Sequence, residues 1–368
     1  MKIRAAVLDR PGTPLTVTDL DLGPPRRGEV LVRVVAAGVC RSDLHIIHGA
    51  TRDPLPAVLG HEGAGIVESV GPGVTAVRAG DPIILAWARA CGECRVCRSG
   101  RPQLCFEGIA DGSLPGGGSR LERAGEPVHH SWGVSCFATH AVLAESMVVP
   151  VASGTDLDLA AIIGCAVTTG VGAVLHTARV TPGSSAVVIG CGGVGQAILQ
   201  ALRMVGADPI VAVDRGAARL QAARDAGATH VLDVAEVRGI DPVAGVLDRT
   251  GGGADYVFEA VGLPATVQQA IAMLGPGGAA IVVGMPAETA RIDIDLHALW
   301  SNERRIVASV YGSSNPREDF PRILRLAGEG RLDLGTMVRR RYPLDRINQA
   351  FADLESDAPG RGIVVMKS

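Results

Sequence analysis

Four of the eight cysteines fall within one short segment rich in Gly and Arg, with the spacing C-x2-C-x2-C-x7-C. They are Cys91, Cys94, Cys97 and Cys105. Four thiolates spaced in this way can close a tetrahedron around Zn²⁺. An iron–sulfur cluster is the alternative, but its bacterial pattern ends in a three-residue gap followed by Pro. Here the last gap is seven residues and Phe106 follows. We therefore predict a structural zinc site in a lobe spanning about residues 88–108.

A run of glycines lies between the apolar segment AVVIG and a helical pattern. The run comprises Gly190, Cys191, Gly192, Gly193, Val194 and Gly195. Strand, turn and helix in this order are the context that the dinucleotide-binding fingerprint requires. The glycines permit a tight turn and let a pyrophosphate approach the backbone at the helix N-terminus. The segment is therefore a candidate cofactor-binding loop.

An acidic residue follows the glycine run at the distance expected for contact with a ribose. Asp214 ends the next strand-like segment, PIVAVD, 24 positions after Gly190. Its carboxylate would accept hydrogen bonds from ribose hydroxyls and repel a 2′-phosphate, which favours NAD over NADP. The neighbouring Arg215 leaves room for some use of NADP, and the alternative for Asp214 is a strand cap without contact to a cofactor.

Other potential metal ligands are dispersed along the chain. Cys40 lies in GVCRSDLH, His61 and Glu62 lie in LGHEGAGIVESVG, and Cys165 lies in IIGCAVTTG. Two thiolates and one imidazole would leave the fourth position of a zinc ion open, as catalytic zinc requires. Each residue alone is more often part of a core, because free cysteine is among the most buried residue types. Spacing alone does not join these residues into a site.

The predicted elements divide the chain into two textures. The first 150 residues contain short β-rich segments separated by Gly and Pro, such as EVLVRVVAAGV and GAGIVESVG. From about Gly164 strands and helices alternate, which predicts a doubly wound parallel sheet. After Tyr311 mixed segments return. We therefore expect an α/β unit inserted into a discontinuous β-rich domain.

Composition excludes several classes of protein. The chain has 368 residues, enough for two domains, with a formal net charge of −3 and 3% aromatic residues. Neither the charge nor the aromatic content suits nucleic-acid binding. No stretch of about 18 uninterrupted apolar residues predicts a membrane span, and the N-terminus carries no secretory signal pattern. We expect a cytoplasmic protein, whose cysteines are reduced thiols or metal ligands rather than a disulfide framework.

These motifs, taken in order, resemble the zinc-dependent medium-chain alcohol dehydrogenase family over essentially the whole chain. The resemblance implies a GroES-like catalytic domain at residues 1–165 and 311–368, interrupted by a Rossmann domain at 166–310. It also implies two zinc ions per chain. The ligands that it implies for the catalytic zinc are Cys40, His61 and Cys165, with Glu62 beside the metal as an inner or exchangeable partner.

The resemblance assigns further roles around that zinc. Ser42 and His45 would form the proton relay, and Asp43 would accept the free N–H of His61. The alternative for His45 is an exposed loop histidine. The residues implied in cofactor contacts besides the glycine run are Arg41, Thr169, Asp214, Arg215 and Arg361. Arg41 and Arg361 could instead be solvated surface arginines. The residues implied in the substrate pocket are Trp87, Ser131 and Trp132, whereas Cys136 and Cys191 are assigned to buried structural roles.

The expected function is oxidoreduction of an alcohol, either primary aliphatic or aromatic, and its aldehyde or ketone, with hydride transfer to NAD. The alternatives are a secondary-alcohol or polyol dehydrogenase, a thiol-adduct formaldehyde dehydrogenase and a non-catalytic dinucleotide-binding protein. The long segment 107–130 resembles that of dimeric branches of the family. It favours a homodimer, with a homotetramer as the alternative.

Overall fold

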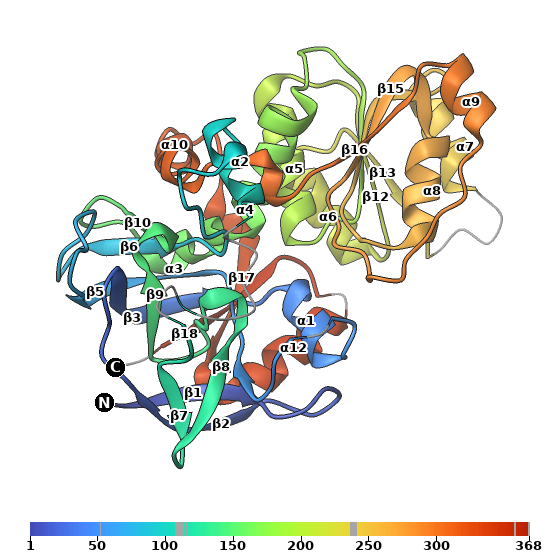
Figure 1. Cartoon of the computed structure of the whole chain (residues 1–368). Helices are drawn as coiled ribbons and strands as arrows, with labels where there is room; N and C mark the ends of the chain where they lie inside the picture. Colours follow the sequence, from blue (N-terminus) through green and yellow to red (C-terminus); the bar gives the residue numbers. More distant parts are fainter. Residues whose placement is uncertain (52, 107–113, 115–116, 236–240, 357, 367–368) are drawn as a thin grey trace.

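The computed structural model describes the whole chain except residues 52, 107–113, 115–116, 236–240, 357 and 367–368. Two predicted segments therefore lie partly outside the described residues. These parts are residues 107–108, at the end of the predicted zinc lobe, and residues 107–113 and 115–116 of the long segment 107–130. Two bodies are visible, one built around β-strands and one around a parallel sheet covered by helices (Figure 1).

The β-rich body contains a closed barrel and a larger mixed sheet. The barrel strands, in order, are β1 (Lys2–Leu8), β2 (Thr16–Leu22), β7 (Leu121–Arg123), β8 (Glu126–His130) and β4 (Ala57–Val58). The sheet runs β10 (Val148–Pro150), β6 (Pro82–Leu85), β5 (Gly63–Val70), β3 (Glu29–Gly38), β18 (Arg361–Val365) and β17 (Val338–Pro343), with β9 (His140–Ala144) also paired to β3. The predicted β-rich domain is confirmed.

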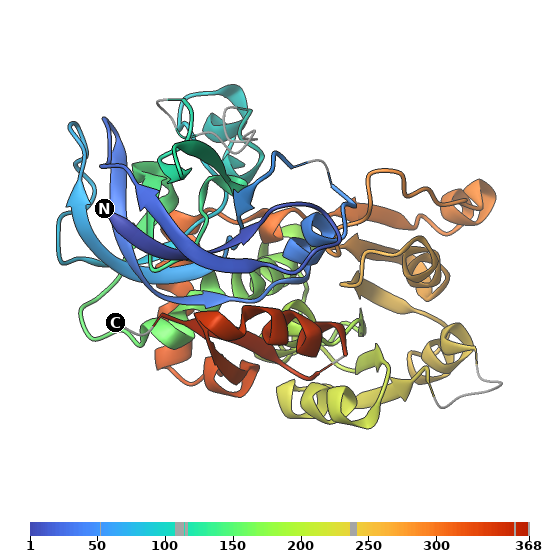
Figure 2. The same ribbon diagram turned by 90° about the horizontal axis from the view of Figure 1, so that it is seen from below.

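The C-terminal segment returns to this body. Strand β18 pairs antiparallel with β3, with Ile363 opposite Gly38, and parallel with β17. Viewed from below, the C-terminal strands and α12 lie beside the N-terminal strands (Figure 2). Helices of this body are α1 (Arg41–Ile47), α2 (Arg95–Arg98), α3 (Leu157–Ala160), α10 (Pro316–Gly328), α11 (Leu334–Met337) and α12 (Ile347–Glu355). The discontinuous arrangement expected from the sequence is therefore present.

The second body is a parallel sheet with the order β13-β12-β11-β14-β15-β16. Its strands are β13 (His230–Asp233), β12 (Ile210–Asp214), β11 (Ala186–Ile189), β14 (Ala254–Glu259), β15 (Leu274–Val282) and β16 (Arg305–Ala308). Its helices are α5 (Gly193–Val205), α6 (Ala217–Ala226), α7 (Pro242–Arg249), α8 (Pro264–Ala272) and α9 (Leu296–Ser301). Strand β11 lies between β12 and β14, so the strand order reverses there. In such sheets ligands bind at the carboxyl ends of the strands on either side of this point.

Two segments connect the bodies. The first is α4 (Ala166–Gly172), which continues as a π-helix over Ala173–Ala178. The second is the short 3₁₀ segment Tyr311–Ser313, which follows β16. A single cluster of buried side chains includes residues of both bodies and both connections, among them Ile84, Val171, Leu199 and Tyr311. The two bodies therefore share a core, and the exact domain boundaries at 165 and 310 stay predictions.

Within the described ranges no single helix is both long and apolar enough to cross a membrane, although the bent pair Leu157–Gly164 and Ala166–Ala178 meets those criteria by length and composition.

Candidate active site

The structure brings the dispersed ligand candidates together. Cys40 lies two residues after the end of β3 and caps the start of α1, His61 lies shortly before β5, and Cys165 directly precedes α4. All three are buried, and their ligand atoms lie within 4.8 Å of one another. Ligand atoms of a tetrahedral zinc site are about 3.5–3.8 Å apart, given bond lengths of about 2.0–2.3 Å. The set fits a zinc ion after small shifts of the side chains.

One nitrogen of the His61 ring is already engaged. Its Nδ1 lies 3.2 Å from Asp43 Oδ1, which also accepts a hydrogen bond from the Gly60 N–H at 3.2 Å. This leaves Nε2 as the nitrogen for a metal, the usual arrangement for a ligating histidine. Burial alone would lower the pKa of His61, but the charges of Asp43 and Cys40 raise it well above its usual value.

Glu62 pairs with a residue from the far end of the chain. Its Oε1 accepts from the Ala166 N–H at 2.9 Å, and its Oε2 accepts from Arg361 Nε at 2.9 Å and from Arg361 Nη2. Both side chains are buried. Among the described residues, Glu62 is not part of the group that could hold a metal. The carboxylate lies behind the ligand set and is fully occupied by protein donors.

Arg361 is not a solvated surface arginine, so that alternative is wrong. It is 4% exposed and extends from β18 past Glu62 to the glycine run. A Cβ atom placed on Gly193 would lie 3.1 Å from Arg361 Cδ. The guanidinium thus lies between the metal ligands and the start of α5, where the phosphates of a dinucleotide would bind. Arg41, by contrast, is exposed and donates to the Leu354 carbonyl at 3.4 Å.

The predicted relay residues share one short helix. Ser42 Oγ lies 3.6 Å from Cys40 Sγ, and Ser42 is three residues before His45 in α1, so both project from one side of the helix. His45 is partly buried, and burial lowers the pKa of its imidazole. Serine and histidine are both residue types that can pass on a proton in catalysis.

The glycine run adopts the predicted strand–turn–helix form between β11 and α5. Gly190 has a φ of +91°, which favours glycine. A Cβ on Gly195 would clash with the Gly190 carbonyl oxygen, so α5 packs closely on the turn. A Cβ on Gly192 would meet no atom within 4 Å. That open space, with no side chain capping the N-terminal N–H groups of α5, is a cradle that a pyrophosphate fits.

Asp214 ends β12 beside the glycine run, and its carboxylate holds the loop. Oδ2 accepts from the Cys191 N–H at 2.5 Å. Oδ1 accepts from the Arg215 N–H at 2.6 Å and lies 3.5 Å from Arg219 Nη1. Oδ2 keeps a further lone pair, which could accept a hydrogen bond from a ribose hydroxyl. Cys191 itself is buried, which agrees with a structural role.

Aromatic side chains line one side of the metal-ligand set. The indole of Trp132 stacks on the His61 ring at 5.3 Å between centroids. Trp87 meets Trp132 edge to face at 5.0 Å, and the ring of Tyr311 lies 4.3 Å from Trp87. Ser131, next to Trp132, is buried. Of the three predicted pocket residues, Trp132 therefore lies against the ligand candidate His61, Trp87 lies against Trp132, and Ser131 adjoins Trp132 in the chain. Thr169 lies in α4, where a Cβ on Gly312 of the second connection would be 2.7 Å from its carbonyl oxygen.

Sequence reasoning missed Tyr311. It was recognised only as the point where the texture of the chain changes. Its hydroxyl donates to the Gly164 carbonyl, directly before Cys165, and burial raises the pKa of the phenol well above its usual value. The tyrosine is therefore a neutral donor. The Glu62–Arg361 pair was also missed, because 299 residues separate its members and no local pattern joins them.

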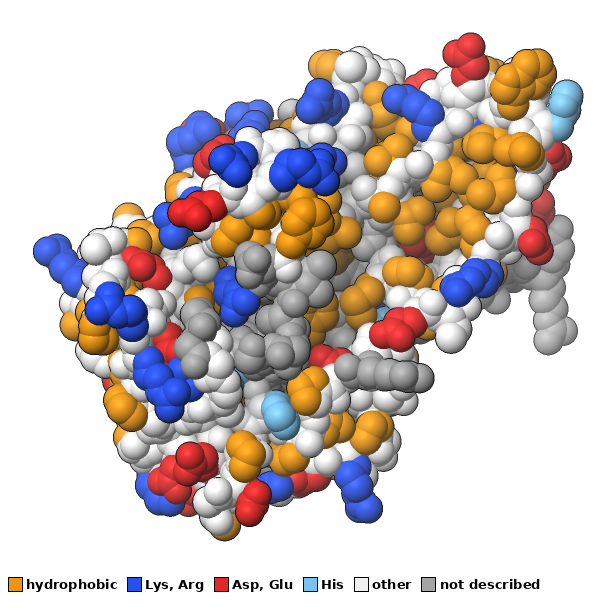
Figure 3. Space-filling model, viewed as in Figure 1, with side chains coloured by type: hydrophobic (Ala, Val, Ile, Leu, Met, Phe, Trp, Pro, Cys, Tyr) orange, Lys and Arg blue, Asp and Glu red, His pale blue; other side chains and the backbone are white. Residues whose placement is uncertain are grey.

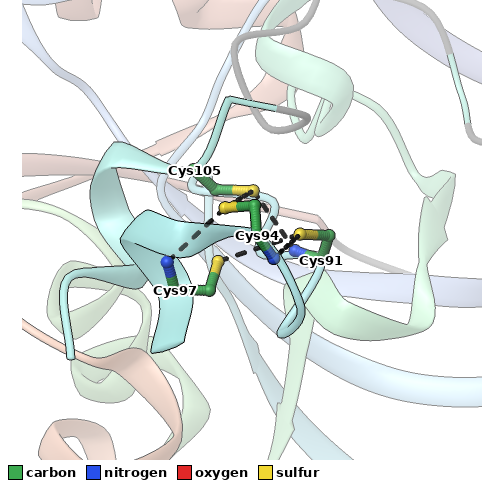
Figure 4. Close-up of side chains that lie close together, drawn as sticks. All are labelled: Cys91, Cys94, Cys97 and Cys105. Atoms are coloured by element: carbon green, nitrogen blue, oxygen red, sulfur yellow. Dashed lines mark hydrogen bonds between the residues drawn. The ribbon is translucent and has the colours of Figure 1, made fainter. Parts of the chain in front are cut away.

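The four clustered cysteines form a second, separate group (Figure 4). Their sulfur atoms lie within 4.8 Å of one another, with Cys91 and Cys97 at 4.0 Å and Cys94 and Cys105 at 3.9 Å. Backbone N–H groups point at these sulfurs, and that of Cys97 is the main cause that lowers the pKa of Cys94 to about 6. Four sulfur atoms this close together favour a closed tetrahedral site for a structural zinc ion.

Two family models match the chain. The description "Alcohol dehydrogenase GroES-like domain" covers residues 26–153, and "Zinc-binding dehydrogenase" covers residues 193–329. An NDMA-dependent alcohol dehydrogenase of Amycolatopsis methanolica is 35% identical over 371 residues, covering 99% of each chain.

Solved structures agree over the full length. An alcohol dehydrogenase zinc-binding domain protein from Burkholderia ambifaria matches with a TM-score of 0.94 at 38% identity. The benzyl alcohol dehydrogenase of Acinetobacter calcoaceticus matches with a TM-score of 0.93 at 35% identity. Each comparison covers 100% of both chains. These matches to family models and full-length relatives show that the chain belongs to the zinc-dependent medium-chain alcohol dehydrogenase family and is an oxidoreductase of alcohols.

Proposed function

We propose that the protein oxidises a primary aliphatic or aromatic alcohol to its aldehyde with NAD as hydride acceptor and a catalytic zinc ion. One observation carries this proposal: the buried set of Cys40, His61 and Cys165 offers three ligands with Glu62 occupied elsewhere. Three protein ligands leave a coordination position for substrate. Zinc held there would supply Lewis acidity to the alcohol oxygen.

The chain's own residues supply the remaining steps. Ser42 would take the alcohol proton, and His45, three residues later on α1, would carry it toward solvent. Asp43 holds the His61 ring in the orientation that directs Nε2 to the metal. The glycine run and Arg361 would bind the pyrophosphate, and Thr169 would pack at the nicotinamide.

The aromatic wall supports an apolar, ring-bearing substrate. Trp87 contacts both Trp132 and Tyr311, and Trp132 stacks on His61. Stacked or edge-to-face contacts favour a further ring. The similarity to a benzyl alcohol dehydrogenase points to the same class. An aromatic primary alcohol is therefore the substrate that the site suits best.

We propose that the chain forms a homodimer through the β16 edge of its parallel sheet. In the part of the chain that the structure describes, β16 pairs only with β15, which leaves one side of it open. Beside it Leu296 and Trp300 of α9 are 73% and 76% exposed. Hydrophobic atoms gather over the region of α8 and α9 (Figure 3). A second copy would pair with the open edge of β16 and cover this surface.

The reduced thiols would suit a cytoplasmic location of the protein.

The function is tested by following NADH formation with primary aliphatic, benzylic, secondary and polyhydroxy alcohols and a formaldehyde–thiol adduct. Metal content is measured on the same preparation. The expected result is turnover fastest with benzylic alcohols and about two zinc ions per chain. Cys40→Ser should lower kcat/KM by about a thousandfold or more and remove one zinc, with NADH binding retained. Cys136→Ala, a buried cysteine outside both groups, is the control, and full activity of Cys40→Ser would disprove the metal assignment.

Cofactor preference is tested at Asp214. In Asp214→Gly the repulsion of a 2′-phosphate is lost and Arg219 loses its carboxylate partner. The ratio of kcat/KM for NADP to that for NAD should rise by about tenfold or more, since a charged hydrogen bond contributes about 1.5–3 kcal/mol. The same change at Asp233, which ends the neighbouring strand β13, is the matched control. An unchanged ratio in Asp214→Gly would refute the ribose contact.

The lobe is tested at Cys97. Cys97→Ala should remove one zinc per chain and lower the Tm by about 5 °C or more, because a structural zinc contributes several kcal/mol to folding. The kcat per folded molecule should change by less than about twofold to threefold, because the lobe does not contact the proposed catalytic zinc. Ser99→Ala, in the same lobe, should alter neither zinc content nor Tm. Retention of both zinc ions by Cys97→Ala would contradict the assignment.

The dimer is tested by light scattering at Trp300. Trp300→Lys places a charge in the proposed contact and should shift the mass toward that of one chain. Val234→Lys changes an exposed residue after β13, at the opposite edge of the same sheet, and should leave the mass unchanged. If Trp300→Lys remains a dimer, the proposed interface at the β16 edge is wrong.

A further inference from the structure

The second connection between the two bodies has an unusual backbone. Three successive residues, Tyr311, Gly312 and Ser313, have φ values of +55°, +66° and +53°. This left-handed region is unfavourable for tyrosine and serine. Such residues persist where surrounding contacts determine their conformation, and they gather at functional sites. The contacts around this segment are therefore informative.

The first connection between the bodies holds the second in place. A Cβ on Gly312 would lie 2.6 Å from the Thr168 carbonyl oxygen, so the backbone of this segment is pressed against α4. Nine residues further along the first connection, Thr177 Oγ1 lies 2.8 Å from the hydroxyls of both Ser309 and Ser313. The segment has little freedom to move relative to α4, and its conformation aims the Tyr311 side chain into the catalytic body.

Tyr311 makes two separate contacts there. Its ring lies against Trp87, at 4.3 Å between centroids. Its hydroxyl donates to the carbonyl oxygen of Gly164, the residue directly before Cys165. Gly164 is itself tightly packed, because a Cβ on it would lie 2.6 Å from the Leu85 carbonyl oxygen. The tyrosine is 2% exposed, so no solvent competes for its hydrogen bond.

We propose that Tyr311 is a positioning residue for the metal centre, which fixes the Gly164–Cys165 peptide and so the direction of the Cys165 thiolate. It does so from the segment that joins the two bodies. Through Trp87 and Trp132 the same ring supports the face of His61. Tyr311 therefore contacts the surroundings of two ligand residues, and the inference rests on the proposed function because it requires a metal at this site.

The hydroxyl is what separates positioning from packing. A tyrosine that only filled space would use its ring, and Phe would replace it with little effect. A tyrosine that positions Cys165 acts through the hydrogen bond to Gly164, and Phe would leave that buried carbonyl without its donor. Tyr311→Phe keeps the contact with Trp87 and removes only this bond.

The first readout is the visible spectrum of enzyme in which cobalt replaces zinc, because thiolate-to-cobalt bands report the geometry of the sulfur ligands. Tyr311→Phe is expected to shift these bands and to lower kcat about tenfold, with a smaller change in the KM for alcohol. A spectrum and kcat equal to those of the wild type would overturn the proposal. Wild-type protein without metal at the Cys40 site would instead overturn the proposed function, and the inference with it.

Two variants serve as controls. Tyr342→Phe also removes one tyrosine hydroxyl, which bonds to Asp353 on α12, and should leave the cobalt spectrum unchanged. Thr177→Val breaks the hydroxyl contacts of the connecting segment without touching the Tyr311 hydroxyl. It should lower the Tm but shift the cobalt bands less than Tyr311→Phe does. A shift as large in Tyr342→Phe as in Tyr311→Phe would overturn the specific role.

A second measurement needs no variant in the site and covers the case in which Tyr311→Phe does not fold. The chain has three tyrosines, so uniform labelling with 3-fluorotyrosine gives three ¹⁹F resonances. The Tyr311 resonance, assigned from Tyr256→Phe and Tyr342→Phe, should move when cadmium replaces zinc, because the hydroxyl senses the Cys165 segment. The other two resonances should stay. A Tyr311 resonance unaffected by the exchange would overturn the proposal.

Discussion

The buried ion pair of Glu62 and Arg361 is the constraint on which the site depends. Charges removed from water are costly unless their hydrogen bonds are complete. Here Glu62 accepts from Arg361 and from the Ala166 N–H, so both of its oxygens are satisfied. The pair joins the turn before β5, the start of α4 and the C-terminal strand β18. Each of these carries or adjoins a residue of the proposed metal or cofactor site.

This pair also explains why the chain must return to its first domain. Arg361 lies on β18, and β18 reaches Glu62 only because it pairs with β3. The same strand directs the arginine past Gly193 toward the glycine run. An arginine supplied from within the Rossmann body could approach the phosphates, but it would not also neutralise the carboxylate behind the metal ligands. The discontinuous architecture thus puts one cation between two sites.

Local patterns made part of this predictable. The glycine run could be predicted because strand, turn and helix are contiguous in the sequence. At Gly190 and Gly195 the structure shows the steric need for glycine, since a Cβ atom would clash there. The cysteine lobe is equally local. Cys40, His61 and Cys165 were joined only through resemblance to a family, since spacing carries no information on dispersed ligands. The contacts of Tyr311 and the ion-pair partner of Arg361 could not be predicted from the sequence, because only the tertiary structure brings these residues together.

The aromatic wall gives the candidate site a largely apolar boundary on the side of His61. Trp132, which stacks on His61, has a φ of +54°, and Tyr311 has a φ of +55°. Two residues of the aromatic wall therefore have a left-handed backbone conformation. Packing on both sides fixes those rings, and a fixed wall discriminates by shape. Apolar pockets distinguish one methylene by about 1–3 kcal/mol, and they reject an added hydroxyl group no more strongly. The wall should therefore discriminate mainly by the overall shape of the substrate, and only modestly between substrates that differ by one methylene or one hydroxyl group.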